Sequence, residues 1–461
     1  MVTSKSIGIL LLACAQLIHA AYSIGTHVFR ESAIQYSSDD VLKEDRVSQN
    51  QIHEVIIAVR QNNMDTLAAL LDDISNPMSA NYGQHMTRLE VACLTASPDS
   101  LDEIVRYLKA AGASVVAESL YGEFITARAP VHLWEKVFNT EFYSYSVRHA
   151  EKIGKKTKTA SRKEREETKY SKKRYIRADR YSVPISLDAH VAFVLNTIQM
   201  PPLLSQKPPP ITQNIHNAQT ESFRNMKIQR MNGRTSGERI EGREEIRGRA
   251  LSARSYMDLT NAITPQVLST AYNIGSNAHH PLATQAVFES LSQTYSADDL
   301  TTFENRFQLP DIPAVVSDDD YSNSSPYCYE NPGMCTEGNL DIQYLTAVSG
   351  GPTSYLYTDF TFFSVWLSEI ADMVTPPLVI SVSYGIDEIY VSQSELDAFS
   401  VQAIKLSAMG VTLLVAAGDD GAGSWSVRMD PSNCGYMPYF PASSPYVTAV
   451  GGTQVSPRKN I

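Results

Sequence analysis

The sequence predicts a parallel α/β domain in its C-terminal half, preceded by a separate α+β domain. Two runs of apolar and β-branched residues, 378–383 and 411–417, are typical of strands buried on both faces. Residues 394–409 between them have the pattern of a helix that ends at Gly410. A strand, a helix and a second strand in this order form a crossover between parallel strands, so a parallel sheet is the economical fold.

Length and composition indicate a globular protein with more than one domain. The 461 residues are 43% hydrophobic and 19% charged, enough to build cores in two or three domains. The formal net charge of -11 argues against a general nucleic-acid binder. It suits a protein that stays soluble in an acidic compartment.

Residues 1–22 are predicted to be a secretory signal peptide. Lys5 precedes an apolar run at 7–18, and small residues follow this run. The run is too short to span a membrane, and no other segment reaches that length. A buried N-terminal helix is the alternative. The favoured interpretation places the protein in the secretory pathway, in a lysosome, a vacuole or the extracellular space, without a membrane span.

The cysteines fit an oxidising compartment. Cys14 would leave with the signal peptide, and the others are Cys93, Cys328, Cys335 and Cys434. Cys328 and Cys335 bracket a short loop that contains proline and glycine, and we expect a disulfide between them. No histidine pair is spaced to complete a zinc site with them. Asn323 opens the only N-glycosylation sequon, in a polar loop.

Residues 23–202 are predicted to form the first domain. Strands alternate with helices, which indicates an open sheet with helices on one face. The predicted strands are 53–59, 113–117 and 124–127, and the predicted helices are 64–74, 101–111 and 131–138. Ordered patterning returns at 181–202.

A strongly basic run at 151–180 interrupts this domain, and we expect a solvated loop there. A nucleic-acid or heparin patch is less favoured, because no aromatic platform or fold motif accompanies the charges. Residues 203–261 are rich in proline and in charges, and are predicted to be a flexible linker with the processing site.

Residues 262–461 are predicted to form the second domain. A helix should open at Thr264-Pro265, where proline stands near the helix start. Further helices are expected at 296–307 and 361–373, and a third parallel strand at 446–450.

Two carboxylates in this domain, Glu337 and Asp341, stand four residues apart. On a helix this spacing puts both on one face, one turn apart. Like charges there repel, so the pair is unfavourable unless something uses it. The alternative is an acidic first turn with Thr336 as N-cap, which the helix dipole tolerates. Leu340 and Tyr344 are expected to face inward beside the pair.

Two strand ends are unusual, and in open parallel sheets chemistry gathers beyond the carboxyl ends of strands. Ser383-Tyr384-Gly385 follows one strand, and the glycine-rich segment 418–423 follows the next, with Asp419 at its mouth. A phosphate-binding loop fits poorly, because Asp419 and Asp420 would repel phosphate and no lysine follows. A plain turn remains open.

In this order, and followed by the Gly-Gly-Thr-containing segment 441–453, the motifs resemble the sedolisin family, the serine-carboxyl peptidases. Residues 73–77 and Tyr82-Gly83 resemble that family's propeptide. The resemblance implies a subtilisin-like parallel-sheet peptidase domain, incomplete here, behind an α+β propeptide domain. It also implies an acidic-pH peptidase that releases N-terminal tripeptides or cleaves internally. Its partners would be peptides or unfolded proteins and its own propeptide.

The resemblance implies that Glu337 is the general base for a serine nucleophile, that Asp341 orients it, and that Asp419 lies in the oxyanion hole. The chemistry is reasonable, because a carboxylic acid has an unperturbed pKa of about 4 and is a useful base near that pH. A protonated aspartic acid can also donate a hydrogen bond to a developing oxyanion.

The family's serine segment, of the Gly-Thr-Ser-x-Ser type, has no counterpart after Thr453 in this sequence. The calcium site that the family implies would also lie beyond Ile461. We therefore expect a truncated or incomplete precursor, inactive alone. The alternative is a catalytically inactive secreted protein that acts through its propeptide as an inhibitor or binding module.

Overall fold

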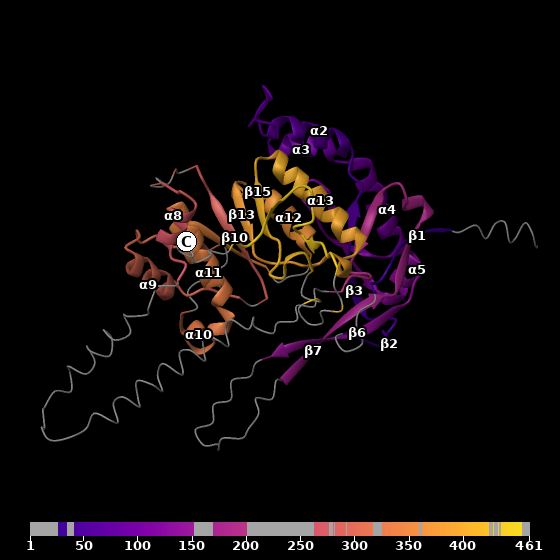
Figure 1. The fold of residues 1–461 in the computed structure, drawn as a ribbon. Helices are drawn as coiled ribbons and strands as arrows, with labels where there is room; N and C mark the ends of the chain where they lie inside the picture. The colour runs from indigo at the N-terminus through magenta and orange to yellow at the C-terminus, as the bar shows by residue number, and fades with distance from the viewer. Residues whose placement is uncertain are drawn as a thin grey trace, which may run out of the picture. The chain divides into compact units, whose positions relative to one another are not determined.

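The structure is a computed structural model, shown in Figure 1. It describes residues 26–34, 41–151, 169–200, 262–275, 280, 282–291, 293–316, 325–358, 362–423, 427, 432 and 435–453. The predicted signal peptide, the linker, Asn323 and Cys434 lie outside the described residues, as do the predicted boundaries at 22, 202 and 261.

The chain forms two units. The first unit consists of Met1–Leu204, Thr284–Leu291 and Leu356–Ile461, and the second of Ser205–Ala283 and Ser292–Tyr355. Among the helices of the described residues, none is long and apolar enough to cross a membrane.

The N-terminal domain, residues 26–200 of the first unit, is built on a four-stranded antiparallel sheet of order β4-β5-β3-β9. Alternate side chains of β3 are fully buried, among them Val55 and Ile57, so one face of the sheet carries the core. The strands are β3 (Ile52–Val59), β4 (Ser114–Glu118), β5 (Phe124–Pro130) and β9 (Val191–Leu195).

Helices cover this sheet, and all three predicted helices are present. The helices are α2 (Met64–Ser75), α3 (Arg88–Thr95), α4 (Pro98–Ala111) and α5 (Val131–Phe138). Helix α4 has proline in its first turn and ends at Gly112, whose φ of 96° lies in the left-handed region. The additional helix α3 begins with a capping box formed by Thr87 and Glu90.

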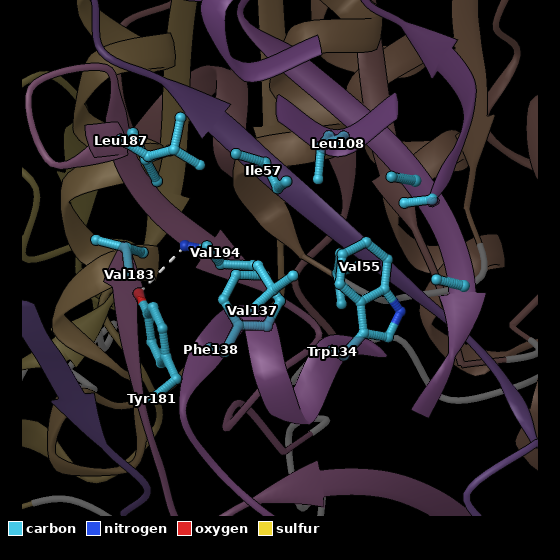
Figure 2. Close-up of a cluster of buried hydrophobic side chains, with 14 of the residues drawn as sticks. Val55, Ile57, Leu108, Trp134, Val137, Phe138, Tyr181, Val183, Leu187 and Val194 are labelled. Atoms are coloured by element: carbon cyan, nitrogen blue, oxygen red, sulfur yellow. Dashed lines mark hydrogen bonds between the residues drawn. The ribbon is translucent and has the colours of Figure 1, made fainter. Parts of the chain in front are cut away.

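Aliphatic side chains, with a few large aromatic ones among them, fill the core of the N-terminal domain (Figure 2). The rings of Trp134 and Phe138 stack with centroids 5.5 Å apart. The Trp134 indole N–H donates to the His53 carbonyl at 2.9 Å, and the Tyr181 hydroxyl accepts from the Val194 amide at 3.1 Å. The buried polar atoms of these large side chains are therefore paired.

Two further antiparallel sheets complete the domain and correct the prediction for the basic run. Strands β2 (Val41–Arg46), β6 (Phe142–Glu151) and β7 (Lys169–Ala178) form one sheet, and β1 (His27–Ser32) pairs with β8 (Arg180–Pro184) in the other. Residues 169–178 were predicted as part of a loop but form β7. The reason is cross-strand pairing, since Tyr175 of the basic run stands opposite Tyr145.

The second predicted fold, a parallel α/β sheet, is confirmed. A six-stranded sheet has the order β11-β12-β10-β13-β15-β17, and β10, β13 and β15 lie side by side (Figure 1). Ala286, Ile380 and Leu413 align across these three strands in parallel register. The strands are β10 (Gln285–Glu289), β11 (Val315–Val316), β12 (Thr353–Tyr357), β13 (Val379–Val382), β15 (Thr412–Ala416) and β17 (Thr448–Val450).

Helices α12 (Phe363–Ala371) and α13 (Gln393–Ala408) pack with the core of this sheet, close to the predicted bounds. Phe288 of β10 meets the Trp366 ring edge-on at 4.5 Å between centroids. A short antiparallel pair, β14 (Ile386–Asp387) and β16 (Tyr439–Phe440), lies outside the main sheet.

The second unit carries α8 (Pro265–Ala271), α9 (Ala297–Phe307), α10 (Ser325–Glu330) and α11 (Thr336–Ser349). Helices α8 and α9 lie where the sequence predicted them. A disulfide joins Cys328 to Cys335 with their Cα atoms 5.6 Å apart, the pairing that the sequence predicted.

Candidate active site

The two candidate carboxylates lie on α11 in the second unit. Because residues 336–349 are helical, Glu337 and Asp341 share one helix face, one turn apart, as their spacing predicted. Both side chains are half-buried. Glu337 stands in the first turn, where the helix dipole favours a negative charge.

The start of α11 differs from the prediction. Cys335, not Thr336, occupies the N-cap position, and no side chain caps the helix. The Thr336 hydroxyl donates to the Pro332 carbonyl at 3.0 Å, so Thr336 already belongs to the first turn. The alternative prediction, an acidic first turn with Thr336 as its N-cap, is therefore wrong about the N-cap residue.

The inward face of α11 also differs from the prediction. Gly338, Ile342 and Thr346 are its buried residues. Leu340 is 48% exposed, and Tyr344 is only half-buried. The helix thus turns its smallest residue, rather than its leucine, toward its neighbours.

Gly338 explains this orientation. A Cβ at this position would lie 2.5 Å from the Thr294 carbonyl oxygen and 3.1 Å from the Tyr355 hydroxyl. That hydroxyl in turn donates to the Gln293 carbonyl at 3.0 Å. The absence of a side chain between the two carboxylates therefore lets α11 approach the 293–294 backbone closely.

Asn339 fixes the same helix from its other side. Its side-chain oxygen accepts from the Ser296 amide at 2.8 Å, and its side-chain nitrogen donates to Asp299 at 3.0 Å. Ser296 is the N-cap of α9 and accepts from the Asp299 amide. The N-terminus of α9 and the carboxylate-bearing turn of α11 are therefore held together.

Asp419 lies in the first unit, in the loop after β15. Its side chain is exposed, and the loop begins at Gly418, whose φ of 84° lies in the left-handed region. The loop borders a pocket of about 710 Å³. The pocket is lined by Ala417, Gly418, Asp419, Gly421, Ala422, Met437, Pro438, Tyr439, Ala442, Ser443, Ala449, Gly451 and Gly452.

Tyr439 forms a wall of this pocket, and no sequence motif around it predicts this position. A Cβ at Gly385 would lie 2.3 Å from the Tyr439 ring, so the ring packs on that glycine. Burial, with added repulsion from Asp419, Asp387 and Asp420, raises the pKa of the Tyr439 hydroxyl to about 12. The phenol therefore stays neutral at acidic and neutral pH.

Tyr384, in the loop after β13, is anchored to the end of β10. Its hydroxyl donates to a buried Glu289 carboxylate oxygen at 2.7 Å and lies 3.3 Å from the Ser290 carbonyl. The Ser383-Tyr384-Gly385 loop is thus tied to the neighbouring strand at the carboxyl edge of the sheet.

The three predicted site residues fall in two units. Glu337 and Asp341 share a helix of the second unit, and Asp419 belongs to the first. That all three act in one site remains a prediction. The supporting roles of Gly338 and Tyr439 depend on contacts between residues far apart in the chain, which spacing does not reveal.

The resemblance also implies a bound calcium ion. Within the described ranges, no group of three or more His, Cys, Asp or Glu side chains is arranged to hold a metal ion. These residues therefore do not fit a metal site, and no ligand is assigned.

Comparison with known proteins adds independent information. Residues 39–200 match the family model "Pro-kumamolisin, activation domain". Tripeptidyl-peptidase 1 of Rattus norvegicus is 27% identical over 427 residues, which cover 88% of this chain and 62% of the relative. For the Homo sapiens protein the identity is 27% over 417 residues, covering 86% and 60%. The chain thus spans only 60–62% of the length of these curated relatives.

One matching solved structure is a Pseudomonas sedolisin (serine-carboxyl proteinase) complexed with two molecules of pseudo-iodotyrostatin. It is 22% identical, covers 42% of this chain and 55% of that chain, and superposes with a TM-score of 0.33. The strand order of this chain identifies the parallel α/β sheet without that superposition.

In this chain, an antiparallel domain that matches the Pro-kumamolisin activation domain is followed by a parallel α/β sheet. Together with the similarity to tripeptidyl-peptidase 1 over most of the chain, this match relates the chain to peptidase precursors that carry such an activation domain.

Proposed function

We propose that this chain is part of the precursor of a serine-carboxyl peptidase that works at acidic pH. Its substrates would be peptides or unfolded proteins, from which it would release N-terminal tripeptides. The observation that carries the proposal is the similarity to tripeptidyl-peptidase 1 over 86–88% of the chain. The predicted signal peptide and the disulfide support a place in the secretory pathway, with a lysosome or vacuole as the acidic destination.

In the proposed mechanism, Glu337 takes the proton from a serine hydroxyl as that oxygen attacks the scissile carbonyl. Asp341, one turn further along α11, hydrogen-bonds to Glu337 and orients it. Asp419, in its carboxylic acid form, donates a hydrogen bond to the oxyanion of the tetrahedral intermediate. The pocket beside Asp419 would receive substrate. Carboxylic acids suit these roles near pH 4, where both protonation states are accessible.

The nucleophile and the calcium ligands are not assigned to residues of this chain. Residues 234–237 carry a Thr-Ser pair, but they precede the peptidase fold and lie outside the described residues. The proposal therefore assigns the base, its orienting partner and the oxyanion donor, and no others.

A second candidate function is an inhibitory or binding protein that works through its activation domain. The observation that favours it is the extensive packing of this domain on α13, described below. Such a protein would bind a related peptidase without cleaving peptides itself.

The experiment is cleavage of an N-terminal tripeptide amide at about pH 4, near the carboxylate pKa. It uses protein expressed from the natural transcript, with Glu337→Gln and Asp341→Asn as test variants. Asp298→Asn, an exposed acid in the first turn of α9, is the matched control. Loss of cleavage in both test variants, with the control unchanged, supports the proposal. Full activity in either test variant contradicts it, and an inactive product that inhibits a related peptidase supports the second candidate.

A further inference from the structure

Helix α13 of the parallel sheet is covered by the activation domain from one end to the other. At its C-terminal end the Met86 amide donates to the Ala408 carbonyl at 2.8 Å. Next to it the His85 ring packs on Gly410, where a Cβ would lie 2.8 Å from the ring. At its N-terminal end the Ser394 hydroxyl donates to Glu31 at 2.5 Å and accepts from the Gln199 side chain at 3.1 Å.

Between these ends the contact is largely apolar. One buried cluster joins Ile404 and Ala408 of α13 to Leu67, Leu71, Ile74 and Val91 of the activation domain. A second joins Ala398 and the preceding Phe362 to Ala58, Phe124, Phe193 and Leu195. Removing this much apolar surface from water is the main driving force for docking.

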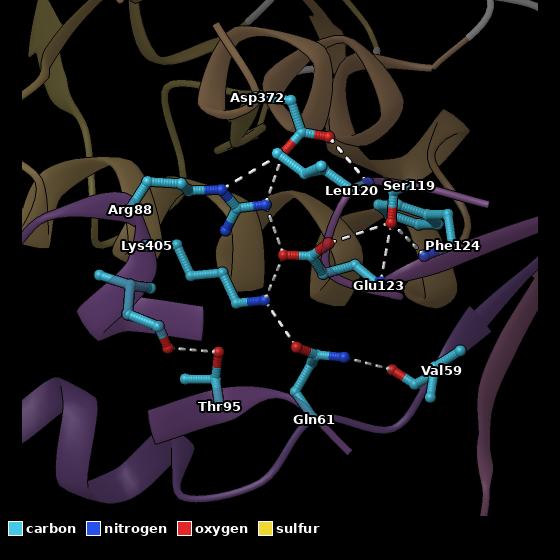
Figure 3. Close-up of polar contacts among 11 residues, drawn as sticks. Val59, Gln61, Arg88, Thr95, Ser119, Leu120, Glu123, Phe124, Asp372 and Lys405 are labelled. Carbon is cyan, nitrogen blue, oxygen red and sulfur yellow. Dashed lines mark hydrogen bonds and ion pairs between the residues drawn. The ribbon is translucent and has the colours of Figure 1, made fainter. Parts of the chain in front are cut away.

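An ionic network lies within this apolar contact (Figure 3). The Lys405 side chain is 0% exposed, and its ammonium lies 3.2 Å from Glu123, which is 2% exposed. It also donates to Gln61 at 2.6 Å. Arg88 of the activation domain lies 2.7 Å from the same Glu123 oxygen and 2.7 Å from Asp372, which follows α12. The network therefore alternates in charge and crosses the contact twice.

A buried lysine is stable only while its partner is in place. Breaking a buried ion pair by removing one member leaves the other charge uncompensated, which is strongly destabilising. Docking of a domain that lacked Glu123 would bury the Lys405 ammonium without a counter-charge. This network therefore makes docking specific to a domain that presents a carboxylate at this point.

The network changes little between pH 7 and pH 4. Burial by itself raises the pKa of Glu123, but the charges of Lys405 and Arg88 outweigh it and bring that pKa to about 2. Burial lowers the pKa of Lys405 to about 8, although Glu123 opposes this. Asp372 is the other charge that faces both cations. Glu123, Lys405 and Arg88 therefore all remain charged from pH 7 down to pH 4.

The contact at the N-terminus of α13 is also maintained in acid. Burial raises the pKa of Glu31, against its hydrogen bonds from Ser394, and Asp397 of α13 adds to the increase. Tyr181 of β8 is the other titratable group near Glu31. A carboxyl group whose pKa is raised in the folded chain is stabilised there in its protonated form, so acid does not weaken this contact.

We propose that the Arg88–Glu123–Lys405 network is an acid-resistant latch, which keeps the activation domain docked on α13 at pH 4–5 after the linker has been cut. Acid alone would then not free the peptidase domain, and a further event, such as proteolysis of the activation domain itself, would be required. The choice of pH range rests on the proposed function, but the latch itself is a binding property and needs no catalysis.

The test uses the full chain with a recognition sequence for a site-specific protease placed between residues 203 and 261. After cleavage, the two fragments are followed by size-exclusion chromatography at pH 7, 5, 4, 3 and 2. The latch predicts that they elute together from pH 7 to pH 4 and separate only as the pH approaches 2. Separation of the unmutated fragments at pH 5 overturns the proposal, whether or not the protein proves to be a peptidase.

Two variants test the network itself. Glu123→Gln leaves Lys405 without its carboxylate and is expected to weaken docking by roughly 100-fold or more at pH 5. Lys405→Met removes the buried cation but leaves Arg88 with Glu123, so the fragments should still dock near pH 7 and separate at a higher pH than the unmutated protein. Glu54→Gln, in the exposed pair with Arg128, is the matched control and should behave as unmutated.

Near-UV circular dichroism of the uncut chain shows whether Glu123→Gln folds, and if it does not, Lys405→Met alone decides the question. If Lys405→Met separates at the same pH as the unmutated protein, the network is not the latch. If the protein shows no peptidase activity but its fragments dock as predicted, only the proposed function is overturned.

Discussion

Glu395 should make the protein more stable in acid than at slightly alkaline pH. Its carboxylate is buried in the first turn of α13, where it accepts from the Ser364 hydroxyl at 2.6 Å and from the Ser364 amide at 3.0 Å. Burial outweighs these bonds and raises the pKa of Glu395 from 4.5 to about 7. A raised folded-state pKa gives stability that is fully present below about pH 4.5 and is lost as the pH rises through 7.

The magnitude follows from the difference in pKa between the folded and unfolded states. At 1.36 kcal/mol per pH unit, the change amounts to about 3 kcal/mol in the free energy of unfolding between pH 4.5 and pH 8. Glu395→Gln keeps the shape and a hydrogen-bonding oxygen but cannot ionise. The unmutated protein should therefore lose about 3 kcal/mol more than this variant does over that range.

Urea unfolding at pH 4.5 and pH 8 measures the difference, with Glu54→Gln as an exposed control that should follow the unmutated protein. Other acids with raised pKa values, such as Glu31 and Glu369, contribute equally to both proteins and cancel in the comparison. An identical loss of stability in Glu395→Gln and the unmutated protein would refute the reasoning.

Two further substitutions test single features of the structure. Gly338→Ala should destabilise the protein by about 1–3 kcal/mol, because its Cβ would meet the Thr294 carbonyl oxygen at 2.5 Å; urea unfolding should show no such loss for Gly333→Ala, where nothing lies within 4 Å. Burial lowers the pKa of His53 to about 4 and outweighs the hydrogen bond to Asn196. The contribution of His53 to stability is therefore lost as the pH falls from 6.5 to 4. His53→Gln should accordingly lose less stability than the unmutated protein over that range. An unchanged pH dependence of unfolding in the variant would contradict this account of His53.

The elements that the sequence predicted well are those whose apolar pattern is strong. In residues 131–138 the apolar side chains recur at helical spacing, and this segment forms α5 with the predicted bounds. The apolar runs at 378–383 and 411–417 form β13 and β15, although only alternate residues of these strands are fully buried, so the prediction of burial on both faces is wrong.

Other elements depend on partners that a local pattern does not contain. Strands β10 and β12 have five residues each and polar residues at or near their ends, so neither was predicted. The pattern of the basic run predicts a loop, yet part of the run forms β7, since Tyr145 stands opposite Tyr175 across the hairpin. In both cases the neighbouring strand, not the segment itself, decides the structure.

The candidate site shows the same division. The spacing of Glu337 and Asp341 was sufficient to place them on one helix face. It did not reveal that Gly338 between them meets the Thr294 carbonyl. Nor did it reveal Lys405, which looks like an ordinary cation near a helix C-terminus but is buried against Glu123, 282 residues away in the chain.

We propose that Glu337 is the general base of an acid peptidase, and the pH–rate profile of tripeptide-amide cleavage tests this role directly. The profile is measured on protein from the natural transcript, with and without Glu337→Gln. We expect activity near pH 4 that falls by roughly 10²–10⁴-fold in the variant, while the circular dichroism spectrum stays unchanged. Activity that peaks at neutral pH, or that survives Glu337→Gln, would contradict it.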